Sequence, residues 1–195
     1  MGYKQYQQNG SFRITDAPEV VGSITQPATG EIRIKREQFG SFSKITLTLD
    51  NVPQAVVNGT EYQSTKIYTF PEGRILVLGC IATLQQKTTS ALATTLNSGS
   101  TGAIALGSAA ASNVSLTGTM VDLMPSIDFI SSTTINVAGT AVSAPLAASA
   151  QFNGTTTAIP VYLNTAYATT TNVDGNATQT ISGTVVICWV NLGDY

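Results

Sequence analysis

The sequence alternates between apolar and polar residues with the two-residue period of β-strands. Residues 44–50, Lys-Ile-Thr-Leu-Thr-Leu-Asp, place Ile45, Leu47 and Leu49 on one face. β-Branched residues dominate much of the remaining chain, and no long stretch has the 3.6-residue period of an amphipathic helix. An alanine-rich segment, residues 107–112, is the one candidate for a short helix. The pattern therefore predicts an all-β protein.

Turn sequences separate the expected strands. Asn58-Gly59, Asn153-Gly154 and Asp174-Gly175 are typical of tight hairpin turns. We expect residues 165–173 and 176–190 to form the arms of a hairpin around Asp174-Gly175. Many short strands joined by turns predict an antiparallel β-sandwich or a jelly-roll-like body.

Another hairpin is predicted around Pro71 and Gly73. Residues 61–70 are strand-like, Pro71 fixes the φ that a turn requires, and Gly73 tolerates a positive φ. Residues 74–84 would then form the returning strand. The two charged residues of this segment are expected at the exposed hairpin tip, with a structural role: Glu72 and Arg74.

Two of the expected strands are apolar on both faces. In residues 74–84 one face carries Leu76, Leu78, Cys80, Ala82 and Leu84, and the other carries Ile75, Val77, Gly79 and Ile81. In residues 181–190 one face carries Ile181, Val185, Ile187 and Trp189, and the other carries Val186, Cys188 and Val190. An antiparallel sandwich usually leaves one face of each sheet in water. We therefore expect the second face of this sheet to be covered by another sheet, by a chain segment or by a neighbouring subunit, and we favour the subunit contact.

The first 40 residues differ from the rest of the chain. Residues 1–30 are polar and interrupted by Gly and Pro, which predicts an extended N-terminal arm, and a basic strip follows in residues 31–39. Residues 41–195 would form the β-sandwich body. Three interpretations of the strip stay open: a solvated strand edge, a docking strip for an acidic protein, and a nucleic-acid contact, for which three cations make a small patch. The cations of the strip are Arg33, Lys35 and Arg36.

Charge is scarce and unevenly distributed. Charged residues make up 10% of the chain, against about 25% in typical proteins. All nine Lys and Arg residues lie at or before Lys87. Residues 88–195 therefore contain no cation, and a surface built from them would attract nucleic acid poorly. We expect no nucleic-acid partner. No apolar run is long enough to cross a membrane, and the N-terminus lacks the apolar segment of a signal peptide, so we expect synthesis in a cytoplasm.

Catalytic chemistry is thinly represented. The chain has no histidine, the commonest general base and metal ligand, and no zinc-binding spacing, so we expect neither a metal nor a cofactor. The glycines in residues 99–107 lack the Lys-Ser/Thr of a phosphate-binding loop. Asp122 and Asp128 are the one candidate pair of carboxylates, and their spacing fits a turn better. Cys80 and Cys188 lie in apolar runs and are expected to be buried thiols. We predict that the protein is not an enzyme.

One segment resembles a known family. Residues 66–79, Lys-Ile-Tyr-Thr-Phe-Pro-Glu-Gly-Arg-Ile-Leu-Val-Leu-Gly, resemble the central motif of the auxiliary capsid proteins of tailed bacteriophages, the decoration or cement proteins on the outside of the head. Further similarity lies at Phe152-Asn-Gly-Thr155, at Val161-Tyr-Leu-Asn164 and in residues 183–195. The resemblance spans about residue 42 to the C-terminus.

The resemblance implies a β-sandwich body, no catalytic residues and a location on the capsid exterior of the virion after synthesis in the host cytoplasm. It implies the major capsid protein as partner and oligomers at symmetry sites of the lattice, with a homotrimer favoured and a dimer possible. On this hypothesis the arm and the basic strip bind the capsid. The expected anchors are Arg13, Arg33, Lys35 and Arg36.

The alternative hypothesis is another virion part, a tail or head fibre domain that binds a host surface glycan. Its binding platform would consist of exposed aromatic residues among Tyr162, Tyr167 and Tyr195. A bacterial surface adhesin and an enzyme rank below both virion hypotheses.

Overall fold

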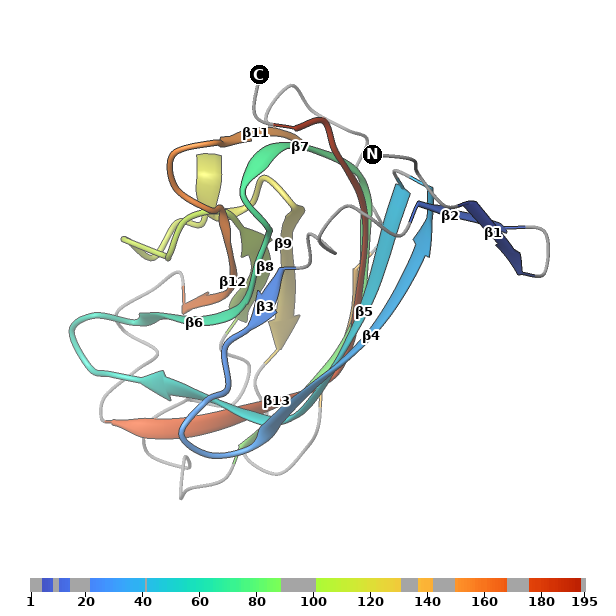
Figure 1. The fold of residues 1–195 in the computed structure, drawn as a ribbon. Helices are drawn as coiled ribbons and strands as arrows, with labels where there is room; N and C mark the ends of the chain where they lie inside the picture. Colours follow the sequence, from blue (N-terminus) through green and yellow to red (C-terminus); the bar gives the residue numbers. More distant parts are fainter. Residues whose placement is uncertain are drawn as a thin grey trace.

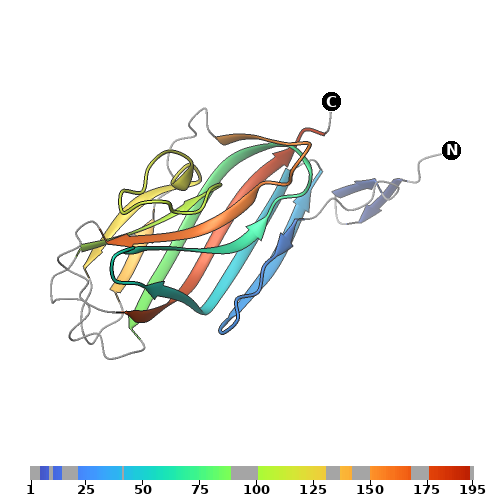
Figure 2. The ribbon, with the colours of Figure 1, turned by 90° about the vertical axis from the view of Figure 1, so that its left-hand side faces the viewer.

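The computed structural model describes residues 5–8, 11–14, 22–40, 42–88, 101–130, 137–141, 150–167 and 176–193. These residues form three antiparallel sheets, of which two face each other as the layers of a sandwich (Figures 1 and 2). The third is a separate hairpin of β1 (Gln5–Gln8) and β2 (Ser11–Ile14), which lies on the β4 side of the sandwich. The prediction of an all-β antiparallel sandwich is confirmed.

The larger sheet has the strand order β10 (Val137–Ala141), β7 (Gly73–Thr88), β13 (Ala177–Asn191), β5 (Phe42–Val56) and β4 (Glu31–Phe39), with β11 (Gln151–Gly154) also pairing with β7. The smaller sheet has the order β3 (Ser23–Ile24), β6 (Tyr62–Thr69), β12 (Pro160–Tyr167), β8 (Thr101–Gly107) and β9 (Met124–Ile130). One 3₁₀ turn, η2 (Gly118–Met120), completes the elements found in the described part of the chain.

The strand order is that of a jelly roll. The chain doubles back between β8 and β9, and the strands before that point pair with the strands after it in reverse order. The nested pairs are β8 with β9, β7 with β10, β6 with β12, and β5 with β13. Rolling this long hairpin places alternate pairs in opposite sheets, which is the double-sheet arrangement of jelly rolls.

The jelly roll overturns the predicted hairpins. β6 and β7 lie in different sheets, so residues 70–73 form a corner across the sandwich, with Gly73 at φ 122°. At this corner the Phe70 amide donates to the Ile159 carbonyl (2.8 Å), and the Asn191 side chain donates to the Glu72 carbonyl (2.8 Å). Glu72 and Arg74 are exposed, as predicted, at this corner. β12 and β13 also lie in different sheets, and Asp174-Gly175 lies outside the described residues.

The predicted helix at residues 107–112 is also wrong. β8 ends at Gly107, and bends follow it. A Cβ atom on Gly107 would lie 2.3 Å from the Met120 carbonyl carbon, so only glycine permits this close approach of two backbones. The close contact between the backbones of Gly107 and Met120 outweighs the helix propensity of the alanines, because propensity is a weak preference that tertiary contacts override.

The core lies between the two sheets, and aromatic rings fill one end of it. Phe70 contacts Tyr68 (centroids 5.5 Å apart), Trp189 (5.6 Å) and Phe152 (6.4 Å). These rings come from the smaller sheet, from the corner after it and from two strands of the larger sheet. Burial of each large apolar side chain stabilises the fold by ~1.5–3 kcal/mol, so this cluster joins the two layers.

A β-bulge in β7 changes which of its apolar residues point inward. Cys188 lies opposite Gly79 and Trp189 lies opposite Val77, so Leu78 has no opposite residue. The extra residue reverses the alternation within the strand. The inward residues are therefore Ile75 and Val77 before the bulge, and Cys80, Ala82 and Leu84 after it. In β13 the inward set is the predicted one: Ile181, Val185, Ile187 and Trp189.

Residues 108–123 cover the outer face of the smaller sheet. Leu116 and Met120 of this segment pack against Ala105 and Ala166 of the sheet as a second apolar cluster. Asn164 of β12 holds the segment in place. Its amide nitrogen donates to the carbonyls of Ala109 (2.9 Å) and Met120 (2.8 Å), and its oxygen accepts from the Ala111 amide (3.1 Å) and the Ser64 hydroxyl (2.6 Å). One buried amide side chain thus satisfies four polar groups.

Replacement of Asn164 by Ala should destabilise the protein by about 2–4 kcal/mol, because it leaves the buried Met120 carbonyl and the partly buried Ala109 carbonyl without donors. The midpoint of thermal unfolding should fall by roughly 5–15 °C. Asn113→Ala is the matched control, since Asn113 is exposed and, among the described residues, accepts a hydrogen bond only from the nearby Ser115 amide (2.8 Å). Equal melting temperatures for the two variants would contradict this role for Asn164.

Alkaline pH should unfold the protein. Burial raises the pKa of Tyr68, of Tyr167 and of the Cys80 thiol to about 12, above the 10.0 and 9.0 of the free groups. Between these values the unfolded chain releases protons that the folded chain retains, so the free energy of unfolding falls as pH rises. Each tyrosine should contribute roughly 1 kcal/mol of this loss by about pH 11. Denaturant unfolding at several pH values measures the slope, and Tyr68→Phe should flatten it.

Candidate partner-binding surface

The described residues include no cluster of three or more His, Cys, Asp or Glu side chains that could hold a metal ion. Nor does a helix in the described part of the chain have the length and apolar character needed to cross a membrane.

The structure separates the candidate carboxylates. Asp122 accepts hydrogen bonds from the Ser108 amide (2.8 Å) and hydroxyl (2.6 Å). Partial burial raises the pKa of Asp122, and the Ser108 hydrogen bonds oppose this shift. Asp128 is exposed in the middle of β9, opposite Ala103. Asp122 precedes β9, whose first residue, Met124, lies opposite Leu106 near the end of β8. Because Asp122 precedes β9 and Asp128 lies well along it, the two do not form a pair; Asp122 closes the turn after β8.

Both cysteines are free thiols. Cys80 points into the core, as predicted, and its burial raises the pKa of the thiol to about 12. Cys188 lies opposite Gly79 on the other side of the same sheet and is only half-buried. The prediction of a buried thiol is therefore confirmed for Cys80 and wrong for Cys188.

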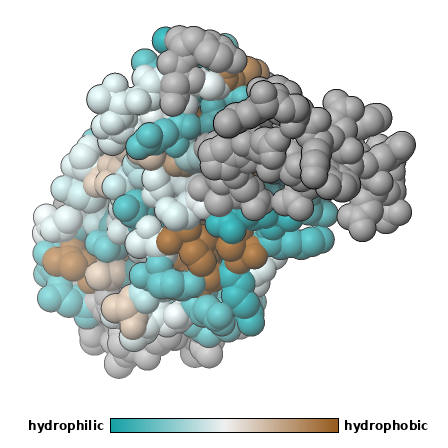
Figure 3. Space-filling model, viewed as in Figure 1, coloured by the Kyte–Doolittle hydropathy of each residue, from teal (hydrophilic) through white to brown (hydrophobic). Residues whose placement is uncertain are grey.

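The outer face of the larger sheet is apolar over β7 and β13. Ile81 is 53% exposed and Leu78 is 37% exposed. Half-buried neighbours complete this apolar half of the outer face: Leu76, Val186, Cys188 and Val190. No described element packs over these strands, in contrast to the outer face of the smaller sheet. Figure 3 views the molecule from the direction of Figure 1, and on this side hydrophobic residues form separate patches, one of them near the centre of the view, among hydrophilic residues.

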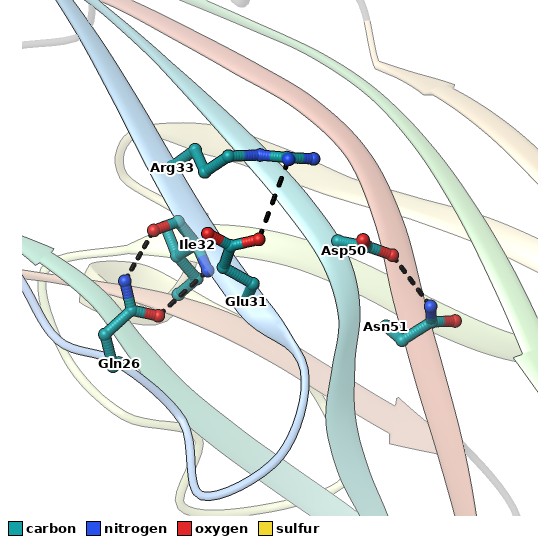
Figure 4. A network of polar contacts seen from close by, with 6 residues as sticks. All are labelled: Gln26, Glu31, Ile32, Arg33, Asp50 and Asn51. Atoms are coloured by element: carbon teal, nitrogen blue, oxygen red, sulfur yellow. Dashed lines mark hydrogen bonds and ion pairs between the residues drawn. The ribbon is translucent and has the colours of Figure 1, made fainter.

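The other half of the outer face, over β5 and β4, is charged. Register places Lys44 beside Glu37, Thr46 beside Lys35 and Thr48 beside Arg33. Glu37 accepts from Lys44 (3.0 Å) and Lys35 (3.3 Å), and these two hydrogen bonds, the one from Lys44 first, lower the pKa of Glu37. Arg33 pairs with Glu31 at 3.6 Å (Figure 4). Carboxylates therefore accompany the cations of the strip.

The structure distributes the four predicted anchors over three places. Arg33 and Lys35 are exposed on the outer face of β4. Arg36 is on the opposite side of that strand, where its guanidinium donates to the Gly22 carbonyl (2.8 Å) and ties β4 to the chain before β3. Arg13 lies on β2 opposite Tyr6, and its side chain lies outside the described features. β4 pairs with β5 from Glu31 to Phe39, so the basic strip is an edge strand of the body.

One of the three tyrosines that the fibre hypothesis requires to be exposed is buried. Tyr167 is 2% exposed and points between the sheets, where its hydroxyl accepts a hydrogen bond from Gln86 (3.1 Å). Tyr162 is half-buried, and Tyr195 lies outside the described residues. An exposed three-tyrosine platform is therefore not formed.

No family model, curated protein or solved structure matches this chain.

The apolar half of the outer face was only partly visible in the sequence. Strict alternation in β7 assigns Leu78 to the same face as Leu84, whereas the bulge separates them. The signal that marked the bulge was Gly79, an isolated glycine within an apolar strand. The correct outer set, with Leu78 and Ile81 both on the outer face, required the register.

Alanine substitutions can test the bulge. Leu84→Ala and Val77→Ala remove inward side chains, so Leu84→Ala should destabilise the protein by about 2–5 kcal/mol and Val77→Ala by somewhat less. Leu78→Ala and Ile81→Ala remove outward side chains and should change stability by less than about 1 kcal/mol. Denaturant unfolding at low protein concentration measures all four. A large loss for Leu78→Ala with a small one for Val77→Ala would indicate uninterrupted alternation instead.

Proposed function

We propose that this chain is a virion structural protein of a tailed bacteriophage: a decoration or cement protein that binds the outside of the major capsid protein lattice and stabilises the head. The resemblance of residues 66–79 supports the proposal. These residues build the end of β6, the corner across the sandwich and the start of β7. The jelly-roll order is compatible with it, since viral capsid domains use this arrangement, as do lectin domains.

The observation that carries the proposal is the difference between the two outer faces. The protein covers the smaller sheet with its own residues 108–123, held by Asn164. Over the larger sheet, among the described elements, it leaves Leu78 and Ile81 without a cover. Exposed large apolar side chains that gather on one face, rimmed by charges, are typical of a protein–protein interface.

The proposed mechanism is mechanical. The apolar half of the outer face would lose water against a capsid subunit, which supplies affinity, while Arg33 and Lys35 at the rim would orient the contact by pairing with capsid carboxylates. Each contact is small, but many identical copies that bridge neighbouring capsid subunits would resist the pressure of packaged DNA together. Arg36 has a structural role in this proposal, because it bonds within the chain.

Addition of the protein back to purified particles that lack it is the decisive experiment. Leu78→Ser should reduce binding roughly tenfold, because it removes an apolar contact from the interface. Val57→Ser is the matched control: Val57 is 38% exposed, against 37% for Leu78, and follows β5 at another part of the molecule. Binding by the parent and the control with loss in Leu78→Ser would support the proposal.

Charge substitutions test the rim in the same assay. Lys35→Ser should weaken binding modestly and reduce its dependence on salt. Lys66→Ser is the matched control, since Lys66 is an exposed lysine of the smaller sheet. If the parent protein fails to bind particles and instead binds a host glycan, the fibre hypothesis replaces the proposed function. If Leu78→Ser decorates particles as well as the parent does, the apolar half of the outer face is not the interface.

A further inference from the structure

The edge strand β4 has backbone groups that are left without partners. β4 pairs with β5 on one side. On the other side, the Gln26 side chain donates to the Ile32 carbonyl (2.6 Å) and accepts from the Ile32 amide (2.9 Å), as Figure 4 shows. The backbone groups of Ile32 therefore face the free edge. The backbone N–H and C=O groups of successive residues in a strand point to alternate sides, so those of Ile34, Arg36 and Gln38 face the same free edge as those of Ile32.

Gln26 imitates a neighbouring strand at one position only. Among the described residues, no group hydrogen-bonds to the edge-facing amides and carbonyls of Ile34, Arg36 and Gln38. A row of unpaired backbone groups of this kind is a template for a further strand. The free edge is thus limited at one end by the Gln26 cap and at the other by the turn at Gly40, where φ is 64°.

We propose that two copies of this chain pair through this edge, β4 antiparallel to β4, with the twofold axis at Arg36. Ile34 of each copy would then exchange both backbone hydrogen bonds with Gln38 of the other, and the two Arg36 residues would do the same at the axis. Ile32 would fall opposite Gly40, beyond the paired stretch, so Gln26 could keep its position. The two larger sheets would become one continuous sheet, with their outer faces on the same side.

The side chains on the outer face match in this register. Lys35 of each copy lies opposite Glu37 of the second copy, which gives two cross-strand pairs of opposite charge. Arg33 lies opposite Phe39 of the second copy, within reach of a cation–π contact. Phe39 is 59% exposed, the most of any large apolar side chain in the described residues. Its ring contacts Phe42 of its own chain (centroids 6.3 Å apart), and this register would add a second contact.

Neighbouring registers are worse. With the axis at Lys35, two lysines oppose each other and Ile32 would have to release Gln26. With the axis at Ile34, Glu31 opposes Glu37 and Arg33 opposes Lys35. With the axis at Glu37, two glutamates oppose each other. Like charges directly opposite each other destabilise strand pairs. The axis at Arg36 places only the two Arg36 residues in this position, on the inner side of β4, where each guanidinium is bonded to Gly22 of its own chain. The other three registers place like charges opposite each other on the outer face, so the outer-face charges favour the axis at Arg36.

Arg36 itself tolerates this position. Its side chain lies on the inner side of β4, and its guanidinium is turned to the Gly22 carbonyl of its own chain (2.8 Å). The pairing is isologous, since each copy offers the same surface, and it therefore closes as a dimer instead of the trimer favoured from the sequence. The paired stretch runs only from Ile34 to Gln38, so we expect a small interface, below the ~1,200 Å² of stable complexes. The dissociation constant of the dimer should therefore lie in the micromolar range.

Backbone pairing can be tested without altering the body. Gln38→Pro removes an edge-facing amide, which β5 does not use, at both symmetry-related contacts, and should weaken self-association at least about tenfold. Gln38→Ala removes the side chain but keeps the amide, so it should associate as the parent does. Sedimentation equilibrium from about 1 µM to about 1 mM measures association. Circular dichroism checks that each variant is folded.

A charge exchange tests the register. Lys35→Glu and Glu37→Lys each place like charges opposite each other, so each variant alone should associate roughly tenfold more weakly than the parent. An equimolar mixture of the two restores two opposite-charge pairs and should recover association. A monomeric or trimeric parent, unchanged association in Gln38→Pro, or a mixture no tighter than its components would each overturn the inference. The test uses no particles, so it is independent of the proposed capsid role.

Discussion

The structure depends on the burial of one apolar face of each sheet against the other. Phe70 is central to this contact, because its ring touches Tyr68 of the smaller sheet and both Phe152 and Trp189 of the larger sheet. The nested strand pairs of the jelly roll bring these residues together from distant parts of the sequence. The bulge at Leu78 serves the same end, since it keeps Val77 and Cys80 both inside despite their odd separation.

Amide side chains take the structural roles that ion pairs often have elsewhere. Asn164 fastens residues 108–123 to the smaller sheet, Gln26 caps the backbone of β4, and Asn191 holds the corner at Glu72. An amide offers both donors and an acceptor to the backbone without the desolvation penalty of a buried charge. This use of Asn and Gln fits a chain in which charged residues make up only 10%.

The outer face of the smaller sheet is covered, and among the described residues the outer face of the larger sheet is not. The proposed functions follow from that difference. Residues 108–123 cover the outer face of the smaller sheet. The larger sheet exposes Leu78 and Ile81 on one half of its outer face and has the charged edge strand β4 at the other. A capsid contact on the apolar side and a twofold contact on the β4 edge would lie next to each other on one surface, with Arg33 and Lys35 at the boundary between them. Pairing of two copies would place both apolar halves on the same side of a continuous sheet, where a lattice could engage them together.

The sequence by itself determined the all-β class, the inward set of β13 and the exposure of Glu72 and Arg74, because these follow from local alternation and turn chemistry. It also placed cations on β4, and alternation alone assigns Arg36 to the side opposite Arg33 and Lys35. Only the tertiary structure decided which strands pair. The turn signals indicate that the chain reverses, but a reversal within one sheet and a corner between two sheets have similar local sequences. The bulge in β7 and the burial of Tyr167 likewise depend on contacts between residues far apart in the chain.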